Sequence, residues 1–457
     1  MSQIIQSARF SCALGAQQSI LGIPRVVPII HAGPGCSARQ FQFLGGGAAY
    51  QGEGYCGGGQ IPSTNSSQSE VVFGGEKKLA TLIDSTLDIM DGDLYVVLAG
   101  CTAGIVGDDV AQVASDHSTK DKKVIGVDTA GFRGNNYKGH NLVVEGIIEQ
   151  FVGDVDDEPE VEKGLVNVFS VIPYQNVNWR GDLEEIKRIL EGIGLKVNIL
   201  FGYGSRGASE WKKIPNAELN IVLSPWVGLG AAKLAQRKYE TPYLHEPVLP
   251  VGLKATSAFL RRVGKELSLD SDRVNAFIKK EEDRYKKYFV SIGDLFSDLA
   301  AYLPYDAYVS GDDIYGLGSI SFLENELGIN VVKFYDTSDP GKLSQKIVNE
   351  ALENIKEGLS EKTVFEADGA IIKNKIKDEI KERHNKALIL GSSWEKGIAA
   401  ETDSILIYQN NPVVDTVVVN RTYVGYNGGL RLIEDIYSGL FNKGVITNTT
   451  HGEDDKI

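Results

Sequence analysis

The chain has 457 residues, of which 42% are apolar and 24% are charged, a composition typical of a globular protein rather than a disordered one. Its net charge of −14 argues against a nucleic-acid or anionic-membrane surface, because either would need a basic patch. No uninterrupted apolar run reaches the roughly 18 residues that span a bilayer, and polar residues interrupt the N-terminus, so we expect neither a membrane span nor a signal peptide. We therefore expect a cytoplasmic protein whose four cysteines are reduced thiols or metal ligands.

The chain alternates between apolar strands, Gly/Ser/Pro loops and segments with helical periodicity from end to end. This pattern predicts an α/β fold of three Rossmann-like domains with parallel sheets flanked by helices. An acidic segment, residues 153–160, interrupts the pattern and is typical of a linker. We expect a first domain over 1–160, a second over 161–300, and a third over 301–457 that includes a C-terminal helix and a tail.

Each expected domain has its own set of strands. The predicted strands are residues 26–30, 94–99 and 124–127, then 166–172, 197–201 and 219–223, then 307–310, 330–334, 387–390, 404–408 and 416–419. Three helices are also expected. One begins at Asp182 with a capping box completed by Glu185, a long one covers 256–288, and the last lies near 430–441.

Three of the four cysteines occupy similar settings. Cys36 and Cys101 each follow a predicted strand in a glycine-rich loop, and Cys12 precedes the first strand. In parallel α/β sheets the ligand crevice lies beyond the carboxyl ends of the strands. Thiolates there suit an iron–sulfur cluster or zinc, but the spacing of structural zinc sites is missing, which disfavours zinc. Since no CxxC pair is present, spacing alone also leaves open that these are inert buried thiols.

Several residues near the cysteines have two possible roles. His31 could position the Cys36 loop or serve as an ordinary structural histidine. Asp108 and Asp109 are better explained as caps of the following helix than as general acids. Arg133 follows the next strand and could approach the cysteine region.

Four motifs in order resemble the subunits of nitrogenase component 1. They are Cys12-Ala-Leu-Gly-Ala16 followed by Pro28-Ile-Ile-His31-Ala-Gly-Pro-Gly-Cys36, then Val71-Val-Phe-Gly-Gly-Glu-Lys-Lys-Leu79, then Gly100-Cys101-Thr102 with Ile105-Val-Gly-Asp-Asp109, and finally Tyr423-Val-Gly-Tyr-Asn-Gly-Gly429. The four matches span nearly the whole chain. The family fold is three α/β domains, in agreement with the pattern above.

The resemblance implies that Cys12, Cys36 and Cys101 ligate an iron–sulfur cluster shared with a partner subunit. The cluster would be a 4Fe–4S centre or a P-cluster-type 8Fe–7S assembly. Cys56 matches no family ligand and is a possible fourth ligand, although a spare thiol or a loop residue is favoured. The partner would be a paired component 1-like subunit, in an α2β2 hetero-oligomer or a homodimer. Electrons would come from an Fe protein-like ATPase, since this chain has no Gly-x-x-x-x-Gly-Lys-Ser/Thr loop.

Two departures from the family pattern narrow the role. No cysteine follows Cys101, and residues 416–421 contain no histidine, so the ligands that hold the catalytic cofactor in α-type subunits are missing. The sequence therefore favours a β-type electron-relay subunit, or a nitrogenase-like group with different chemistry. The substrate stays open among dinitrogen, a tetrapyrrole double bond, a carbon–sulfur bond or another small unsaturated molecule. A cofactor-assembly scaffold and a small-ligand binding module with inert thiols are the alternatives.

Overall fold

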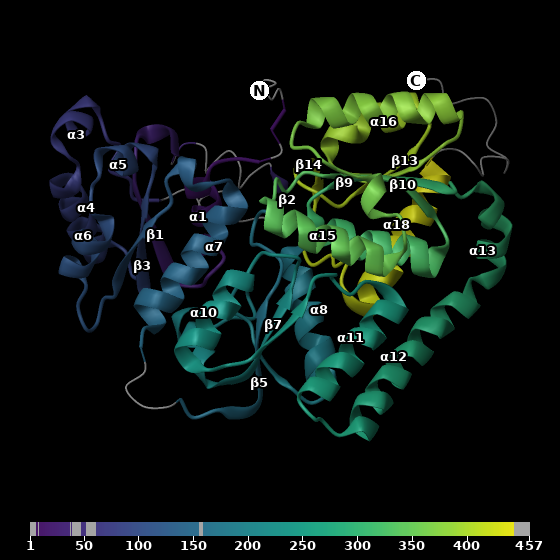
Figure 1. Cartoon of the computed structure of the whole chain (residues 1–457), viewed down its shortest axis with the longest axis horizontal. Coiled ribbons are helices and arrows are strands. Elements are labelled where there is room, and N and C mark those ends of the chain that lie inside the picture. Colours follow the sequence, from purple (N-terminus) through teal and green to yellow (C-terminus); the bar gives the residue numbers. More distant parts are fainter. Residues whose placement is uncertain are drawn as a thin grey trace, which may run out of the picture.

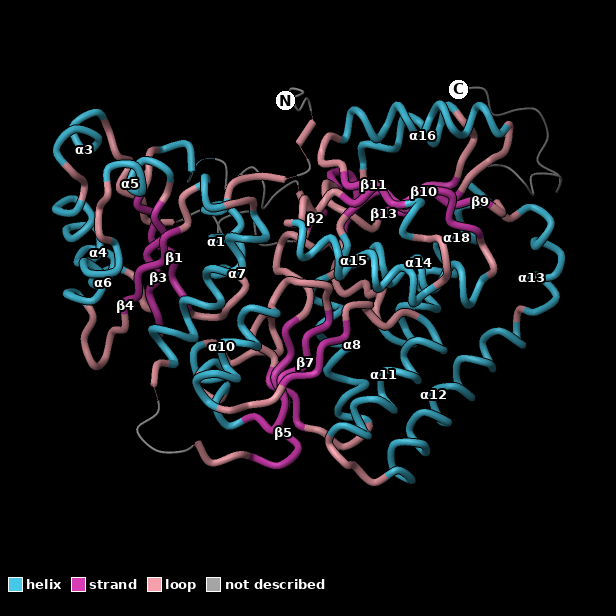
Figure 2. The backbone as a smooth tube through the Cα atoms, in the orientation of Figure 1, coloured by secondary structure: helices cyan, strands magenta, loops and turns pink. Residues whose placement is uncertain are grey.

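The computed structural model describes residues 6–7, 9–36, 38, 47–51, 61–154 and 159–442. Within these residues the strands form three parallel sheets and one two-stranded ribbon, each sheet being flanked by helices (Figure 1). Figure 2 shows the sheets in magenta, well separated along the molecule, with helices around each of them. The predicted fold class is confirmed, although the exact domain boundaries stay predictions.

The first sheet has the strand order β1–β3–β4 and lies at one end of the molecule (Figure 1). Every residue of its first two strands is buried, as expected for a parallel sheet covered on both faces. Its strands are β1 (Val26–His31), β3 (Leu94–Ala99) and β4 (Val124–Asp128), and its helices are α1 (Cys12–Leu21), α3 (Gln68–Phe73), α4 (Glu76–Ile89), α5 (Cys101–Val106), α6 (Val110–His117) and α7 (Asn136–Gly146). These strands confirm the three predicted for this part of the chain.

The second sheet has the order β6–β5–β7–β8. Its strands are β5 (Glu162–Phe169), β6 (Lys196–Asn198), β7 (Ala217–Leu223) and β8 (Tyr243–Glu246), and the helices that follow along the chain are α8 (Trp179–Gly192), α9 (Ala208–Trp211), α10 (Leu229–Tyr239), α11 (Gly252–Glu266), α12 (Ser271–Ser291) and α13 (Gly293–Leu299). The predictions of strands at 166–172 and 197–201 were displaced toward the C-terminus, because the apolar residues after each strand are buried in loops instead.

The third sheet has the order β11–β10–β9–β12–β13. Its strands are β9 (Asp306–Gly311), β10 (Asn330–Asp336), β11 (Thr363–Phe365), β12 (Leu388–Gly391) and β13 (Ile405–Tyr408), and its helices are α14 (Asp313–Phe322), α15 (Lys342–Ile355), α16 (Gly369–Arg383), α17 (Lys396–Glu401) and α18 (Gly425–Asn442). The terminal helix therefore begins earlier than predicted. It also packs on α11 and β13, so it joins the second and third parts of the chain.

A short ribbon joins the two ends of the sequence. The strand predicted at 416–419 is instead β14 (Val413–Val417), and it pairs in parallel with β2 (Ala48–Tyr50) rather than with the third sheet. The last part of the chain thus completes structure that begins between Cys36 and Cys56. Cys56 itself lies outside the described residues.

Two helix predictions were wrong in instructive ways. The predicted helix over 256–288 is two helices, α11 and α12, because Ser268 adopts a positive φ of 49° and the side chain of Asp270 caps a new helix start. The helix expected to begin at Asp182 begins at Trp179. The carboxylate of Asp182 does not cap it, but is fully buried and accepts hydrogen bonds from Thr422 Oγ1 (2.8 Å) and Tyr423 N (2.9 Å).

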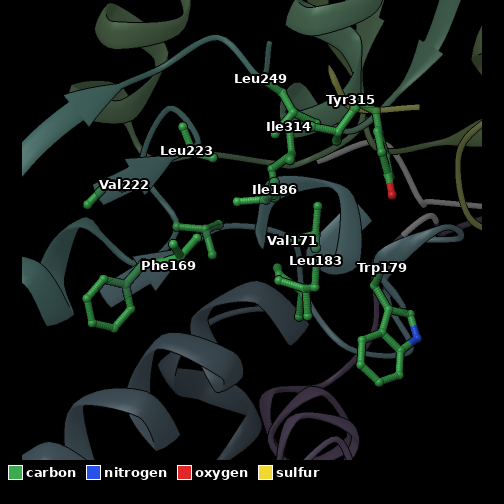
Figure 3. Close-up of a cluster of buried hydrophobic side chains, with 14 of the residues drawn as sticks. Phe169, Val171, Trp179, Leu183, Ile186, Val222, Leu223, Leu249, Ile314 and Tyr315 are labelled. Atoms are coloured by element: carbon green, nitrogen blue, oxygen red, sulfur yellow. The ribbon is translucent and has the colours of Figure 1, made fainter. Parts of the chain in front are cut away.

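A continuous apolar core connects the second and third sheets. Figure 3 shows Phe169 and Val222 from the second sheet, Leu183 and Ile186 from α8, and Ile314 from α14 in one buried cluster. Such burial of large apolar side chains is the main favourable term in holding the sheets together. Among the residues described here, no helix is both long and apolar enough to cross a membrane.

Candidate functional site

The carboxyl ends of the first sheet's three strands are aligned. His31 at the end of β1 is paired with Ala99 at the end of β3, and Ala99 is paired with Asp128 at the end of β4. The loops that follow must therefore leave the sheet at the same edge. Cys36 and Cys101 lie on two of these loops, and the third carries residues 129–135. We call this edge the cysteine edge.

Cys12 reaches the cysteine edge from the N-terminus of α1. This helix packs very closely on α7: a methyl group on Gly139 would lie 2.0 Å from the carbonyl oxygen of Cys12, and one on Gly15 would lie 2.2 Å from that of Asn136. The Cys12 thiol is buried and donates to the carbonyl oxygen of Gly134 (2.8 Å). Burial raises the pKa of this thiol to about 11, so the thiol keeps its proton at neutral pH unless a metal ion binds the sulfur and displaces that proton.

Cys36 and Cys101 lie beside glycine backbone. The Sγ atom of Cys36 is 3.6 Å from the position a methyl group would take on Gly100, the residue before Cys101. The Sγ atom of Cys101 accepts a hydrogen bond from the backbone N–H of Gly131 (3.1 Å), and a methyl group on Gly131 would lie only 2.8 Å from that sulfur. The missing side chain of Gly131 lets its backbone N–H approach the sulfur of Cys101, which stabilises negative charge there.

The three cysteines differ in exposure. Cys12 is buried, Cys36 is half-buried and Cys101 is exposed, so the cysteine edge opens to the surface at Cys101. In the described part of the chain, no three or more Cys, His, Asp or Glu side chains are grouped closely enough to hold a metal ion. The donors are of the kind that ligates iron–sulfur clusters, but three thiols are fewer than the four that such clusters commonly take. The site therefore suits a cluster completed by ligands from another chain.

His31 connects the end of β1, at the cysteine edge, to neighbouring segments. Its ring is fully buried, with Nδ1 3.1 Å from Thr64 Oγ1 and Nε2 2.8 Å from Asp108 Oδ2. The same carboxylate accepts from the backbone N–H of Gly75 (3.0 Å). His31 is thus a structural histidine that ties the end of β1 to two other segments, and Asp108 is its partner rather than a helix cap.

The other predicted residues have structural roles. Asp109 caps α6 by accepting from Gln112 N (3.0 Å), as expected. Arg133 forms an ion pair with Asp128 at the surface, and its Nε lies 3.0 Å from that carboxylate. Its loop reaches Cys101 through Gly131, but the Arg133 side chain is directed to the carboxylate rather than to a cysteine.

Three carboxylates at the corresponding edge of the third sheet were not predicted from the sequence. Asp312 and Asp313 follow β9 directly, and Asp336 is the last residue of β10. All three are buried, with no more than 1% of their surface exposed. The signal that could have found them is the one used for the cysteines, a reactive side chain just after a predicted strand.

A wide groove elsewhere is separate from the cysteine edge. Its volume is about 810 Å³, and it lies between α12, α13, α18 and residues 417–422. These elements are at the opposite end of the molecule from the first sheet (Figure 1). None of the described residues that line it is a cysteine, so we do not assign it to the candidate site.

Similarity to known proteins covers most of the chain. It is 27% identical to the nitrogenase molybdenum-iron protein alpha chain of Methanothermobacter thermautotrophicus, over 94% of this chain and 87% of that one. It is 23% identical to the nitrogenase vanadium-iron protein beta chain of Trichormus variabilis, over 94% and 93% of the two chains. It is also 24% identical to a light-independent protochlorophyllide reductase subunit of Angiopteris evecta, over 76% and 67%. Both alpha and beta chains are therefore among its relatives.

The fold and the family agree. The structure superimposes on one titled "Nitrogenase Cp1 at pH 6.5" with a TM-score of 0.79 at 20% identity, covering 100% of this chain and 97% of that one. The sequence profile of the family described as "Nitrogenase component 1 type Oxidoreductase" matches residues 11–441, which include all four cysteines and all four motifs. The chain belongs to the nitrogenase component 1 type oxidoreductase family.

Proposed function

We propose that this chain is the electron-relay subunit of a nitrogenase-like reductase, with an iron–sulfur cluster bound at the cysteine edge. Cys12, Cys36 and Cys101 would be its ligands from this chain, and a partner subunit would supply the rest. The observation that carries the proposal is the position of these cysteines in a chain of this family. The loops of Cys36 and Cys101 leave the same strand-end edge, and Cys12 donates to Gly134 on the third loop of that edge. When bound, the cluster would accept and pass on electrons singly.

The residues of this chain would act on the sulfur atoms. Cys12 would lose the proton that it now donates to Gly134, because a thiolate is the ligand form. The N–H of Gly131 would keep donating to the sulfur of Cys101 and would stabilise the reduced, more negative state. The bare backbone at Gly100 and Gly131 leaves room beside both sulfurs.

Exposed apolar side chains lie on α5, which begins at Cys101, and on two segments that contact it. Phe73 is 86% exposed, Ile105 is 75% exposed and Phe132 is 61% exposed, and they come from α3, α5 and the loop after β4. We call these residues, with Val71 and Val72, the edge patch. Exposed apolar groups gathered on one surface are typical of a protein interface. The edge patch thus supports a paired component 1-like subunit that covers the cluster, whether a second copy or a relative.

The proposal requires a separate protein that supplies electrons to the cluster. An electron relay needs a donor, and the proposal assigns that role to an Fe protein-like ATPase. The sequence itself has no Gly-x-x-x-x-Gly-Lys-Ser/Thr loop with which to bind ATP phosphates. The names of the relatives indicate different substrates. We therefore leave the substrate of this chain unassigned.

The test is iron and acid-labile sulfide analysis of protein purified without oxygen together with its bound partners. Cys36→Ala should remove most of the visible cluster absorption, whereas Cys56→Ala should leave most of it. Equal losses in the two variants would refute the ligand assignment, and wild-type protein without iron would refute the proposal.

A turnover assay distinguishes an electron-relay subunit from a cofactor-assembly scaffold. With the cognate reductase and ATP, a relay subunit supports reduction of a small substrate, while a cofactor-assembly scaffold supports none. A simple ligand-binding module would give no electron paramagnetic resonance signal from a cluster after reduction.

A further inference from the structure

Three buried aspartates meet where the third sheet faces the first. β9 and β10 are adjacent and parallel, and Asp336 is paired with Gly311, the residue before Asp312. Asp313 is the first residue of α14, so all three carboxylates stand at the carboxyl ends of neighbouring strands. None has more than 1% of its surface exposed. We call Asp312, Asp313 and Asp336 the aspartate trio.

The trio has few hydrogen-bond donors for its charge. Asp313 Oδ2 accepts from Trp226 Nε1 (2.7 Å), and Asp336 Oδ1 accepts from Ser338 N (2.8 Å). The other oxygens, Asp313 Oδ1 and Asp336 Oδ2, have no hydrogen-bond partner in the described structure. Asp312 has two hydrogen-bond donors, because it accepts from Asn176 Nδ2 (3.2 Å) and from the backbone N–H of Tyr315 (2.9 Å).

Arg9 is the cation that faces the trio from the first part of the chain. It is only 9% exposed, its guanidinium lies 4.4 Å from the ring centre of Tyr137, and its Nη2 is 3.5 Å from Thr337 Oγ1. Within the described residues, its Nε and the hydroxyl of Tyr137 are also without hydrogen-bond partners. The charged and titratable groups around Asp313 and Asp336 are therefore Arg9, Tyr137 and Asp312.

One guanidinium cannot balance three carboxylates in a buried site. Ionising neighbouring buried acids is costly, so at least one of them binds a proton at neutral pH. Burial is the largest cause that raises the pKa of Asp336 to about 7, so Asp336 is close to the point where it exchanges its proton. Burial, together with the neighbouring charge of Asp336, raises the pKa of Asp313 well above its ordinary value.

Hydrogen bonds connect the trio to Cys12. Ser338 accepts through Oγ from the backbone N–H of Asp313 (2.8 Å), and its carbonyl oxygen accepts from Asn135 Nδ2 (2.9 Å). Asn135 follows Gly134, the residue whose carbonyl oxygen accepts from the thiol of Cys12. Charge added at the cysteine edge would therefore act on the trio through protein rather than through water, which weakens screening.

We propose that Asp336, with Asp313 beside it, takes up one proton from solvent when one electron enters the cluster at the cysteine edge. The inference rests on the proposed function. The balance is one electron from the reductase and one proton from solvent, so the site gains no net charge. The proton is released again when the electron leaves toward the substrate.

The first measurement is a redox titration of the complete, iron-loaded protein at several pH values. In wild-type protein, the equilibrium constant for reduction should fall as pH rises, by up to about tenfold per pH unit for one proton per electron. Asp336→Asn should lose this dependence, because the amide resembles a protonated acid and cannot titrate. Asp339→Asn is the matched control, since Asp339 is exposed on the same loop, and it should behave as wild type. An unchanged dependence in Asp336→Asn would overturn the inference.

A second measurement detects the proton on Asp336 in protein that contains no iron. Infrared spectra of the metal-free protein should show a buried carboxylic acid band that titrates near neutral pH and is missing in Asp336→Asn. Its absence in wild type would overturn the inference. Wild-type protein that lacks iron after anaerobic purification would instead defeat the proposed function, and the infrared band would show separately whether the trio binds the proton.

Discussion

The Nε2 atom of His31 lies 2.8 Å from Oδ2 of Asp108, with both side chains almost completely buried. This pair joins the end of β1 to the turn after α5, and Asp108 also accepts from Gly75 N. His31 is the last residue of the strand that precedes the loop carrying Cys36. The geometry of the cysteine edge therefore depends on a polar contact beneath it as much as on its own residues.

Asp108→Ala should destabilise the protein by about 2–3 kcal/mol, because it leaves the His31 ring and the N–H of Gly75 without their acceptor. Urea unfolding followed by circular dichroism measures the loss. Asp109→Ala is the control. It removes only a helix cap and should cost about 1 kcal/mol. Equal losses would show that the buried pair contributes nothing special.

Gly139→Ala should force α1 and α7 apart, because the new methyl group would lie 2.0 Å from the carbonyl oxygen of Cys12. We expect a loss of about 1–3 kcal/mol and faster alkylation of Cys12 in the folded protein. The control is Gly397→Ala in α17, where nothing lies within 4 Å of the new methyl group. That change should be neutral or stabilising by up to about 1 kcal/mol. Unchanged alkylation in Gly139→Ala would contradict the packing argument.

Asp182 should make stability depend on pH. Burial raises the pKa of this fully buried carboxyl to about 7, so the folded state binds its proton more tightly than the unfolded state. Its contribution to stability is complete below its ordinary pKa of about 4 and is lost as pH rises through about 7, with a slope of up to about 1.4 kcal/mol per pH unit.

The measurement is the free energy of unfolding across that pH range for wild type and Asp182→Asn. The variant should have a flatter profile, since its amide does not titrate. Glu184→Gln, on an exposed position of the same helix, should keep the wild-type slope. If both variants keep that slope, Asp182 does not bind the proton.

Phe73→Asp should weaken association through the edge patch about tenfold or more, because it places a charge where an apolar side chain is 86% exposed. Light scattering of the complex purified from its source would report the loss of the associated subunit. Val290→Asp is a close match, since that side chain is 81% exposed on α12, at the opposite end of the molecule from the first sheet (Figure 1). A similar effect of both changes would show that the edge patch is not the interface.

Local apolar runs made much of the fold predictable. Strand β3 was predicted to the residue, because six consecutive apolar positions are buried on both faces of a parallel sheet. The long helix over 256–288 was not divided, since the positive φ of Ser268 has no periodic signal. The role of Asp182 could not be predicted because its partners, Thr422 and Tyr423, lie far along the sequence.

The candidate site shows the same limit. Cys36 and Cys101 could be placed at strand ends from sequence, and the motif order added Cys12. The aspartate trio follows predicted strands in the same way, but this position did not single them out, because they are three among 61 acidic residues. Only the register of β9 and β10 brings them together, and only burial makes their charge important.

The pairing of β2 with β14 also bears on the order in which parts of the chain fold. β2 follows Cys36 in the sequence, and its pairing partner β14 follows the strands of all three sheets. Contacts between such distant segments form late, because the intervening chain must first be closed into a loop. We therefore expect β2 to pair only after the strands of the three sheets have been made, so that metal loading at the cysteine edge is a late step.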